Sequence, residues 1–245
     1  MSAVYEPPRP EQQFAVDMSC LGRYESAVER LHAPAQVYVA GDYSLMLPRW
    51  RVAIVGSRLA SQAGLQRARA MAMELARAGV VVVSGLARGI DRAAHEGALD
   101  AGGRTMAVLG TPLDECYPPE HATLQRRLCD QQLVISQFSP GHRTERRDFV
   151  TRNWLMALLC HAVVVVKAGD RSGTLTMLAE AQRLGRLIFL CSEVWETEFQ
   201  NLRSPRRLKW PQRFLEPVFG RPALVVADTA SVITALLEWR EAQEK

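Results

Sequence analysis

The sequence is poor in cysteine, and its cysteines stand far apart. The five are Cys20, Cys116, Cys129, Cys160 and Cys191, and no two of them form a C-x-x-C pair. Cysteines spread this widely argue against both a disulfide scaffold and a zinc site. We therefore expect neither a bound metal nor a cofactor.

Long apolar runs and an export signal are also missing. The longest apolar stretches, such as residues 155–166, contain His161 and are too short to span a bilayer. The first residues, Met-Ser-Ala-Val-Tyr-Glu-Pro-Pro, lack the basic region and following apolar region of a signal peptide. These absences predict a cytoplasmic protein without membrane contact.

Several catalytic motifs are absent too. No G-x-G-x-x-G follows the first strand-like run, and no G-x-x-x-x-G-K-[ST] occurs in the chain. No cluster of carboxylates suits two-metal cleavage of a phosphodiester. The sequence thus argues against the usual dinucleotide site, a P-loop ATPase and a metal-dependent nuclease, and we predict a protein that is not an enzyme.

Charge is nearly balanced, because 30 basic residues face 26 acidic ones and leave a net charge of +4. The distribution is more informative than the sum. Basic residues gather in two stretches, one with Arg143, Arg146, Arg147 and Arg152, the other with Arg203, Arg206, Arg207, Lys209, Arg213 and Arg221. Two solvated loops explain such clusters unless they flank a phosphate-shaped site, in which case an anionic partner is favoured.

What the chain does contain is an alternation of strand-like and helical patterns over 245 residues, a length that suits one large domain. Apolar runs predict strands at Val37–Ala40, Val52–Val55, Val80–Ser84, Thr105–Leu109, Leu133–Ser136, Val163–Lys167 and Leu187–Cys191. Helical patterns lie near Ala60–Ala78, Arg92–Ala101, Thr123–Asp130, Arg152–Cys160 and Thr174–Leu184. Continuous apolar strands separated by helices predict an α/β fold, with a mostly parallel, doubly wound sheet and helices on both faces.

The pattern divides the chain into three parts. Residues 1–36 contain four prolines and a short helical pattern around Met18–Leu31, and we interpret them as an N-terminal extension. Residues 37–192 form the predicted core. Residues 193–245 are a basic, irregular segment that closes with a strand at Ala223–Ala227 and a helix at Asp228–Arg240, for which Asp228 is a good N-cap.

Three loops of this core have unusual chemistry, and each follows a strand. They contain Gly56-Ser57-Arg58, Ser84-Gly85 with Arg88-Gly89, and Ser172-Gly173-Thr174 beside Lys167 and Arg171. Ligands of doubly wound sheets bind beyond the carboxyl ends of the strands. Glycine permits close approach of the backbone, a helix N-terminus offers unpaired N–H groups, and the basic side chains add charge. The three loops together predict a site for phosphate.

Simpler explanations exist for each part of this pattern. A glycine after a strand is most often a tight turn. Asp91 and His95 lie one helical turn apart on one face, but Asp91 also suits a helix start and His95 a half-buried position with satisfied hydrogen bonds. Three such loops at matching positions are harder to explain in this way.

In order, these loops and the stretches GGRTMAVLG, YPPEH and FVTRNWLMALLC resemble the DprA/Smf family of DNA-processing proteins over roughly residues 34–190. The resemblance implies an extended Rossmann-like domain that binds single-stranded DNA in natural transformation and passes it to the RecA recombinase, usually as a homodimer. It also implies a set of pocket residues: Gly56, Ser57, Arg58, Ser84, Gly85, Arg88, Asp91, His95, Arg152, Asn153, Ser172, Gly173 and Thr174. To these we add Lys167 and Arg171 for their charge.

The sequence departs from the family pattern at several positions. The usual Phe-Pro-x-Arg-Asn-Arg ends here in Arg152-Asn153-Trp154, and Lys167 and Gln137 stand where glutamate is common. A basic, aromatic stretch replaces the family's Gly/Asn-rich segment after Ser192-Glu193. We interpret the chain as a divergent member.

Three hypotheses for function follow. In the first, a non-catalytic mediator binds single-stranded DNA, with Arg58 and Arg152 on phosphates at the mouth of one crevice and without a role in folding. Trp154, Trp210 and Phe214 are candidates for base stacking, although core packing is preferred for Phe214. The second hypothesis is a sensor of a free nucleotide. The third, placed last, is a phosphoribohydrolase, which would need a glutamate soon after Gly173-Thr174, whereas Glu180 comes too late.

Overall fold

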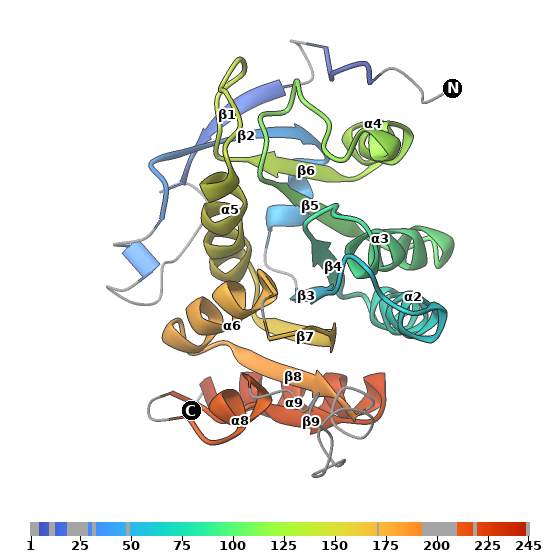
Figure 1. The fold of residues 1–245 in the computed structure, drawn as a ribbon, viewed down its shortest axis with the longest axis vertical. Helices are drawn as coiled ribbons and strands as arrows, with labels where there is room; N and C mark the ends of the chain where they lie inside the picture. The colour runs from blue at the N-terminus through green and yellow to red at the C-terminus, as the bar shows by residue number, and fades with distance from the viewer. Residues whose placement is uncertain are drawn as a thin grey trace.

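The structure is a computed structural model that describes residues 5–9, 13–18, 29–30, 33–47, 50–170, 172–192, 210–217 and 220–243. These residues build one nine-stranded sheet with helices packed on both of its faces (Figure 1). The sheet confirms the predicted α/β, Rossmann-like class. Within the described ranges, no helix is both long enough and apolar enough to cross a membrane.

The strands are ordered β1-β2-β6-β5-β4-β3-β7-β8-β9 across the sheet. Seven of them, β3 to β9, run parallel, whereas β2 pairs antiparallel with β6 and with β1. Their bounds are β1 Gln13–Asp17, β2 Gln36–Gly41, β3 Arg51–Gly56, β4 Val81–Ser84, β5 Thr105–Leu109, β6 Leu133–Ser136, β7 Ala162–Lys167, β8 Leu187–Cys191 and β9 Leu224–Val226. The chain order reverses between β3 and β7, which is where a doubly wound sheet opens a crevice for a ligand.

Helices cover the two faces unequally (Figure 1). α2, α3 and α4 lie on one face, and α5 and α6 lie on the other. The bounds of the helices are η3 Tyr43–Met46, α2 Gln62–Arg77, α3 Ile90–Asp100, η4 Pro119–His121, α4 Ala122–Gln131, α5 Arg146–Leu159, α6 Thr174–Arg183, α8 Trp210–Leu215 and α9 Thr229–Gln243. Asp228 accepts hydrogen bonds from the backbone N–H and the hydroxyl of Ser231, so it caps α9 as predicted.

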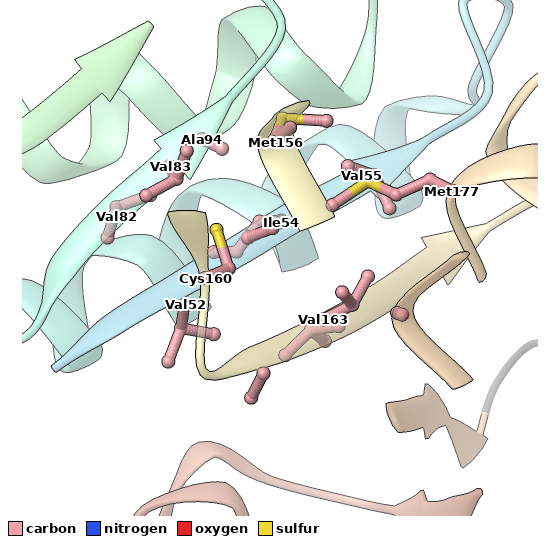
Figure 2. Close-up of a cluster of buried hydrophobic side chains, with 14 of the residues drawn as sticks. Val52, Ile54, Val55, Val82, Val83, Ala94, Met156, Cys160, Val163 and Met177 are labelled. Atoms are coloured by element: carbon pink, nitrogen blue, oxygen red, sulfur yellow. The ribbon is translucent and has the colours of Figure 1, made fainter. Parts of the chain in front are cut away.

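The core fills both sides of the central strands (Figure 2). Residues 162–166 of β7 are all buried, which is why this strand is apolar at every position rather than at alternate ones. Val52 and Ile54 of β3 are also fully buried, and Met156 of α5 and Cys160, directly after the helix, pack beside them. This packing fixes α5 over the sheet, with its first half next to the carboxyl ends of the strands.

The N-terminal part differs from the sequence prediction. Residues 13–17, which we assigned to an extension without a strand, form β1 and pair with β2, with Phe14 opposite Val39. β1 is short, and its five residues are either exposed or half-buried, so its hydrophobic pattern alone does not predict a strand. Pairing with β2 determines its conformation. Of the helix predicted around Met18–Leu31, only Met18, Glu29 and Arg30 are among the described residues.

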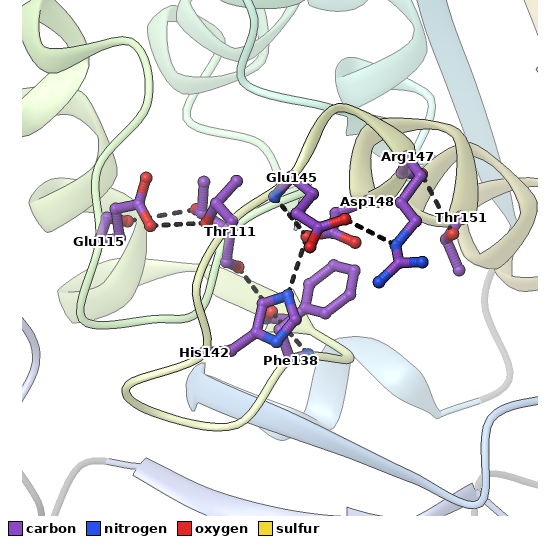
Figure 3. A network of polar contacts seen from close by, with 10 residues as sticks. Thr111, Glu115, Phe138, His142, Glu145, Arg147, Asp148 and Thr151 are labelled. Atoms are coloured by element: carbon purple, nitrogen blue, oxygen red, sulfur yellow. Dashed lines mark hydrogen bonds and ion pairs between the residues drawn. The ribbon is translucent and has the colours of Figure 1, made fainter.

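Helix α5 begins six residues earlier than the predicted Arg152, at Arg146. Its start is a capping box, because Glu145 and Asp148 each accept a hydrogen bond from the other's backbone N–H (Figure 3). His142 also bonds Asp148, at 2.8 Å, and stacks on the ring of Phe138. The arginines that suggested a solvated loop, Arg146 and Arg147, therefore form the first turn of a helix.

Candidate functional site

A crevice of about 480 Å³ opens at the carboxyl ends of the central strands. Its walls come from the loop after β3, the start of α3, the first half of α5 and the start of α6. Nine of the predicted site residues line it: Gly56, Ser57, Arg58, Asp91, Arg152, Asn153, Ser172, Gly173 and Thr174. Parallel strands deliver their following loops to one edge of the sheet, so this gathering follows from the topology.

Arg58 forms the basic lip of the crevice. It is exposed, and its guanidinium carbon lies 5.8 Å from the centre of the Phe149 ring of α5. The preceding turn is held from behind, because the backbone N–H of Ser57 donates to the carbonyl of Lys167 at 2.6 Å. The hydroxyl of Ser57 accepts from the N–H of Leu59 at 3.1 Å. Hydrogen bonds thus fix the turn, and the exposed guanidinium of Arg58 stands at its tip.

The start of α6 forms the opposite wall. The hydroxyl of Ser172 accepts from the N–H of Thr174 at 3.2 Å and donates to its hydroxyl oxygen at 2.9 Å. Asn153 of α5 donates to the carbonyl of Gly173 at 3.0 Å, and so ties the two helices together. No acidic residue stands in the first turn of α6, so no carboxylate of the helix itself offsets the positive end of its dipole at the crevice.

Arg152 lies inside the wall rather than at the mouth. Its side chain is buried, and it donates to the carbonyls of Gly85 and Val108 and to the amide oxygen of Asn153. Burial lowers the pKa of Arg152, and the nearby Asp91 carboxylate opposes that change. Arg152 is thus buried, not exposed at the mouth as expected, and its hydrogen bonds give it a structural role, while its contact with phosphate stays a prediction.

Asp91 supports the neighbouring loop from beneath. Its carboxylate accepts from the N–H of Gly85 at 3.2 Å and from the N–H of Ala87 at 3.4 Å. Burial raises the pKa of Asp91, while Arg152 and the two backbone donors oppose that rise. Gly85 is required here for close approach, since a Cβ on it would overlap the guanidinium of Arg152.

A smaller hollow adjoins the crevice and shares Arg58 and Arg152 with it. Gly85 and Arg88, both predicted site residues, line this hollow together with Ala87, Tyr117, Pro118 and Phe149. The rings of Tyr117 and Phe149 lie 5.3 Å apart at 56°, and Tyr117 is 47% exposed. Arg88 is exposed and forms an ion pair with Glu120.

The remaining predicted site residues that the structure describes do not line the crevice. Ser84 is buried and donates to the carbonyl of Ile54 at 2.7 Å. Lys167 is half-buried at the end of β7 and is not among the lining residues. Arg171 lies outside the described residues, as do Arg203, Arg206, Arg207 and Lys209 of the second basic cluster. The described residues therefore place no basic side chain from the loop after β7 at the crevice.

His95 lies in the core and not on a half-buried face. It is fully buried on α3, and its Nδ1 is 2.7 Å from the hydroxyl of Thr105. Burial lowers the pKa of His95 to about 3, and the positive charges of His121 and Arg152 act in the same direction. His95 is therefore a neutral core residue, one turn deeper than Asp91.

Sequence reasoning missed the aromatic part of the site. Phe149 stood within a quoted motif but was not given a role, and Tyr117 stood within YPPEH. An exposed aromatic cannot be told from a core aromatic by spacing alone. The same holds for the three stacking candidates: Trp210 and Phe214 are buried, and Trp154 is 43% exposed but does not line the crevice.

Residues 21–204 match the family of DNA recombination-mediator protein A. The chain belongs to this family. The DNA processing protein DprA of Streptococcus pneumoniae is 40% identical over 158 residues, which cover 64% of this chain and 55% of the relative. Protein Smf of Escherichia coli is 37% identical over 157 residues, covering 64% and 42%. The chain spans about half the length of these curated relatives.

Solved structures of the DprA family share the fold. The X-ray structure of DprA from Streptococcus pneumoniae gives a TM-score of 0.71 at 29% identity and covers 91% of this chain and 73% of the other. DNA processing protein A of Helicobacter pylori, described as having a unique single-stranded DNA binding mode, gives 0.74 at 24% identity over 93% and 96%. A molybdenum cofactor binding protein of Rippkaea orientalis, at 17% identity and a TM-score of 0.52 over 78% and 98%, is similar in fold alone.

Proposed function

We propose that this member of the DNA-processing family binds single-stranded DNA in the crevice without cleaving it. The observation that carries the proposal is the position of Arg58, whose exposed guanidinium lies beside both the Gly-Ser turn and the Phe149 ring. One side chain therefore borders both the polar groups of the crevice and the aromatic rings of Tyr117 and Phe149. A nucleotide has the same two parts, a phosphate and a base.

The crevice and the adjoining hollow offer groups for different parts of a nucleotide. The crevice offers the hydroxyls of Ser57, Ser172 and Thr174 and the start of α6, which suit a phosphate. At the border of the crevice, Phe149 and the exposed Tyr117 present rings on which an unpaired base can stack, because every base has a face that stacks on an aromatic ring. Paired bases of a duplex are already stacked, so this arrangement favours single strands.

Non-catalytic binding is supported by the carboxylates near the site. Asp91 is the one carboxylate among the described lining residues; it accepts hydrogen bonds from two backbone N–H groups and lies near the positive charge of Arg152. Glu180, the acid considered for a phosphoribohydrolase, is largely buried and forms an ion pair with Arg183. Neither carboxylate is placed to stabilise a cationic sugar.

The test is a titration of Arg58→Ala with single- and double-stranded oligonucleotides over a salt series, without ATP or divalent metal. Removing one phosphate contact should weaken binding to all single-stranded sequences alike and reduce the salt slope by roughly 0.7. Arg77→Ala, an exposed arginine at the end of α2, is the control and should bind like the unchanged protein. Equal affinity for Arg58→Ala and Arg77→Ala would move the site away from this crevice.

We further propose that the protein acts in the cytoplasm as a homodimer, protects incoming single strands and hands them to a RecA-like recombinase. Membership of the recombination-mediator family supports this role. The test is a strand-loading assay in which RecA filament formation on coated DNA is followed with and without the protein, alongside light scattering for the oligomeric state. A free nucleotide that displaces the oligonucleotide at low concentration would favour the sensor hypothesis instead.

A further inference from the structure

The loop after β4 has a strained backbone at one position. Leu86 has a φ of 56°, and it is the one non-glycine residue with positive φ among the described residues. A left-handed conformation brings the Cβ of an L-residue too close to its own carbonyl oxygen, so a leucine adopts it only when its surroundings impose it. Leu86 is also fully buried. Something must hold this residue in place.

Three side chains from three helices hold the loop by its backbone. Asp91 of α3 accepts from the N–H groups of Gly85 and Ala87, and Arg152 of α5 donates to the carbonyl of Gly85. The third is His121, at the end of η4, whose Nδ1 lies 2.9 Å from the carbonyl oxygen of Leu86. A carbonyl oxygen can only accept, so Nδ1 must carry the proton in this contact.

The loop in turn supports the basic lip of the crevice. Ala87 lines the crevice, and the N–H of Ile90 donates to the carbonyl of Ser57 at 3.3 Å. Gly89 has a φ of 76° and packs so closely that a Cβ would overlap the backbone of Ser57 and Arg58. Movement of the loop at Leu86 would therefore be transmitted to the turn that presents Arg58.

We propose that His121 is a positioning residue for the single-stranded DNA site. It is 2% exposed and borders a separate pocket beside Arg88 and Glu120, but it lines neither the crevice nor the adjoining hollow, so it acts on that site through the Leu86 carbonyl. This proposal rests on the proposed function, because the site that it positions is the one assigned to DNA. The imidazole holds the loop in the strained shape that the lip requires.

A positioning residue and a contact residue leave different signatures in binding. When the loop relaxes, only a fraction of the molecules is competent, and the apparent dissociation constant rises by the inverse of that fraction. The number of phosphate contacts in the bound state is unchanged, so the salt slope stays the same. Loss of His121 should thus weaken binding by about 5- to 30-fold, the factor that corresponds to the strain of one left-handed residue, without changing the slope.

The experiment compares His121→Phe with His121→Asn. Phenylalanine keeps the ring and removes the donor, whereas the amide nitrogen of asparagine can take the place of Nδ1 without the ring. We expect His121→Phe to show weaker oligonucleotide binding at unchanged salt slope and faster hydrogen exchange in the peptide that spans residues 84–90. His121→Asn should remain close to the unchanged protein in both measurements. If His121→Phe does not fold, His121→Met, which also lacks the donor, replaces it.

Other outcomes would overturn the proposal. Weak binding by His121→Asn together with normal binding by His121→Phe would mean that the ring packs rather than positions. A reduced salt slope, as expected for Arg58→Ala, would mean that His121 contacts the DNA. Normal exchange of residues 84–90 in His121→Phe would remove the proposed link even if binding fell. Because exchange is measured without DNA, it also separates a failure of this proposal from a failure of the proposed function.

Discussion

At the scale of single residues, Arg58 and Arg152 occupy the same crevice in opposite roles. Arg58 is exposed at the lip, whereas Arg152 is buried and donates hydrogen bonds to two backbone carbonyls and to Asn153. A buried cation with several protein acceptors is a structural element, because removing it leaves those acceptors without a donor and the nearby Asp91 carboxylate without a compensating charge.

We therefore expect Arg152→Ala to destabilise the protein by about 3–5 kcal/mol, the range for breaking a buried charge pair. Arg152→Lys should destabilise the protein by less than Arg152→Ala does, since an ammonium keeps the positive charge but not the several donors of the guanidinium. Urea denaturation measures both. Arg58→Ala is the matched control and should stay within about 0.5 kcal/mol of the unchanged protein. Equal stability of Arg58→Ala and Arg152→Ala would contradict this assignment.

His95 predicts a pH dependence of stability. Its pKa is about 3 in the folded protein, where burial is the largest cause, and about 6.5 in an unfolded chain. Between these values the unfolded chain binds a proton that the folded protein does not, so stability falls as the pH drops below about 6.5. One such group contributes a loss of up to about 1.4 kcal/mol per pH unit.

The free energy of unfolding, measured in denaturant at pH 7.5, 6.5, 5.5 and 4.5, tests this loss. His95→Asn should fold, because its amide can still pair with Thr105. Its free energy of unfolding should fall less steeply with decreasing pH, by the contribution of one histidine. The same profile in both proteins would mean that His95 does not stay neutral in the folded state. His161, whose pKa burial also lowers to about 3, accounts for a slope that remains in His95→Asn.

At the scale of elements, the start of α5 determines where the site residues of that helix point. Asp148 accepts from the backbone N–H of Glu145 and from His142, and these contacts outweigh the effect of its burial and hold its pKa below the ordinary value. Phe149, Arg152 and Asn153 follow within the next two turns. Their directions depend on a helix that begins at Arg146 (Figure 3).

Asp148→Ala removes half of the capping box and should cost about 1 kcal/mol of stability, the usual value for a helix cap. The melting temperature would fall by roughly 2–4 °C for a chain of this size. Arg147→Ala provides the comparison: it removes only an exposed ion pair with Glu145, which contributes little. A larger loss of stability in Arg147→Ala than in Asp148→Ala would mean that the capping box does not determine where α5 begins.

At the scale of the whole molecule, distant segments hold the loop that carries Tyr117. The hydroxyl of Tyr5 donates to the carbonyl of Leu113 and accepts from Gln125, both at 2.8 Å. Gln125 also donates to the carbonyl of Glu115, at 3.1 Å. The first described segment of the chain is thus fastened to α4 and to the loop after β5.

Tyr5→Phe should therefore lower stability by about 1 kcal/mol, because one hydroxyl with two partners is lost and the ring remains. Denaturant unfolding measures the change. Tyr38→Phe is the control, since the described residues show no hydrogen bond to the hydroxyl of Tyr38. If both variants unfold at the same denaturant concentration, the contacts of Tyr5 do not stabilise the folded state.

The sequence alone was sufficient for the class of fold, the order of the core strands along the chain and three loops that meet at one crevice. The physical reason is that buried parallel strands need apolar residues at every position, and loops after such strands share one edge of the sheet. Gly56, Ser57 and Arg58, and the start of α6 at Thr174, lie where this reasoning placed them.

Other features depend on tertiary contacts and could not be predicted from the spacing of residues in the sequence. β1 exists because β2 offers it an edge, and α5 begins at Arg146 because Glu145 and Asp148 cap it. Burial placed Arg152 in the wall of the crevice and His95 in the core, whereas Tyr117 and Phe149 stay accessible at the hollow beside Arg58. Whether a polar or aromatic side chain faces protein or solvent depends on residues far away in the chain, and that information exists only once the chain has folded.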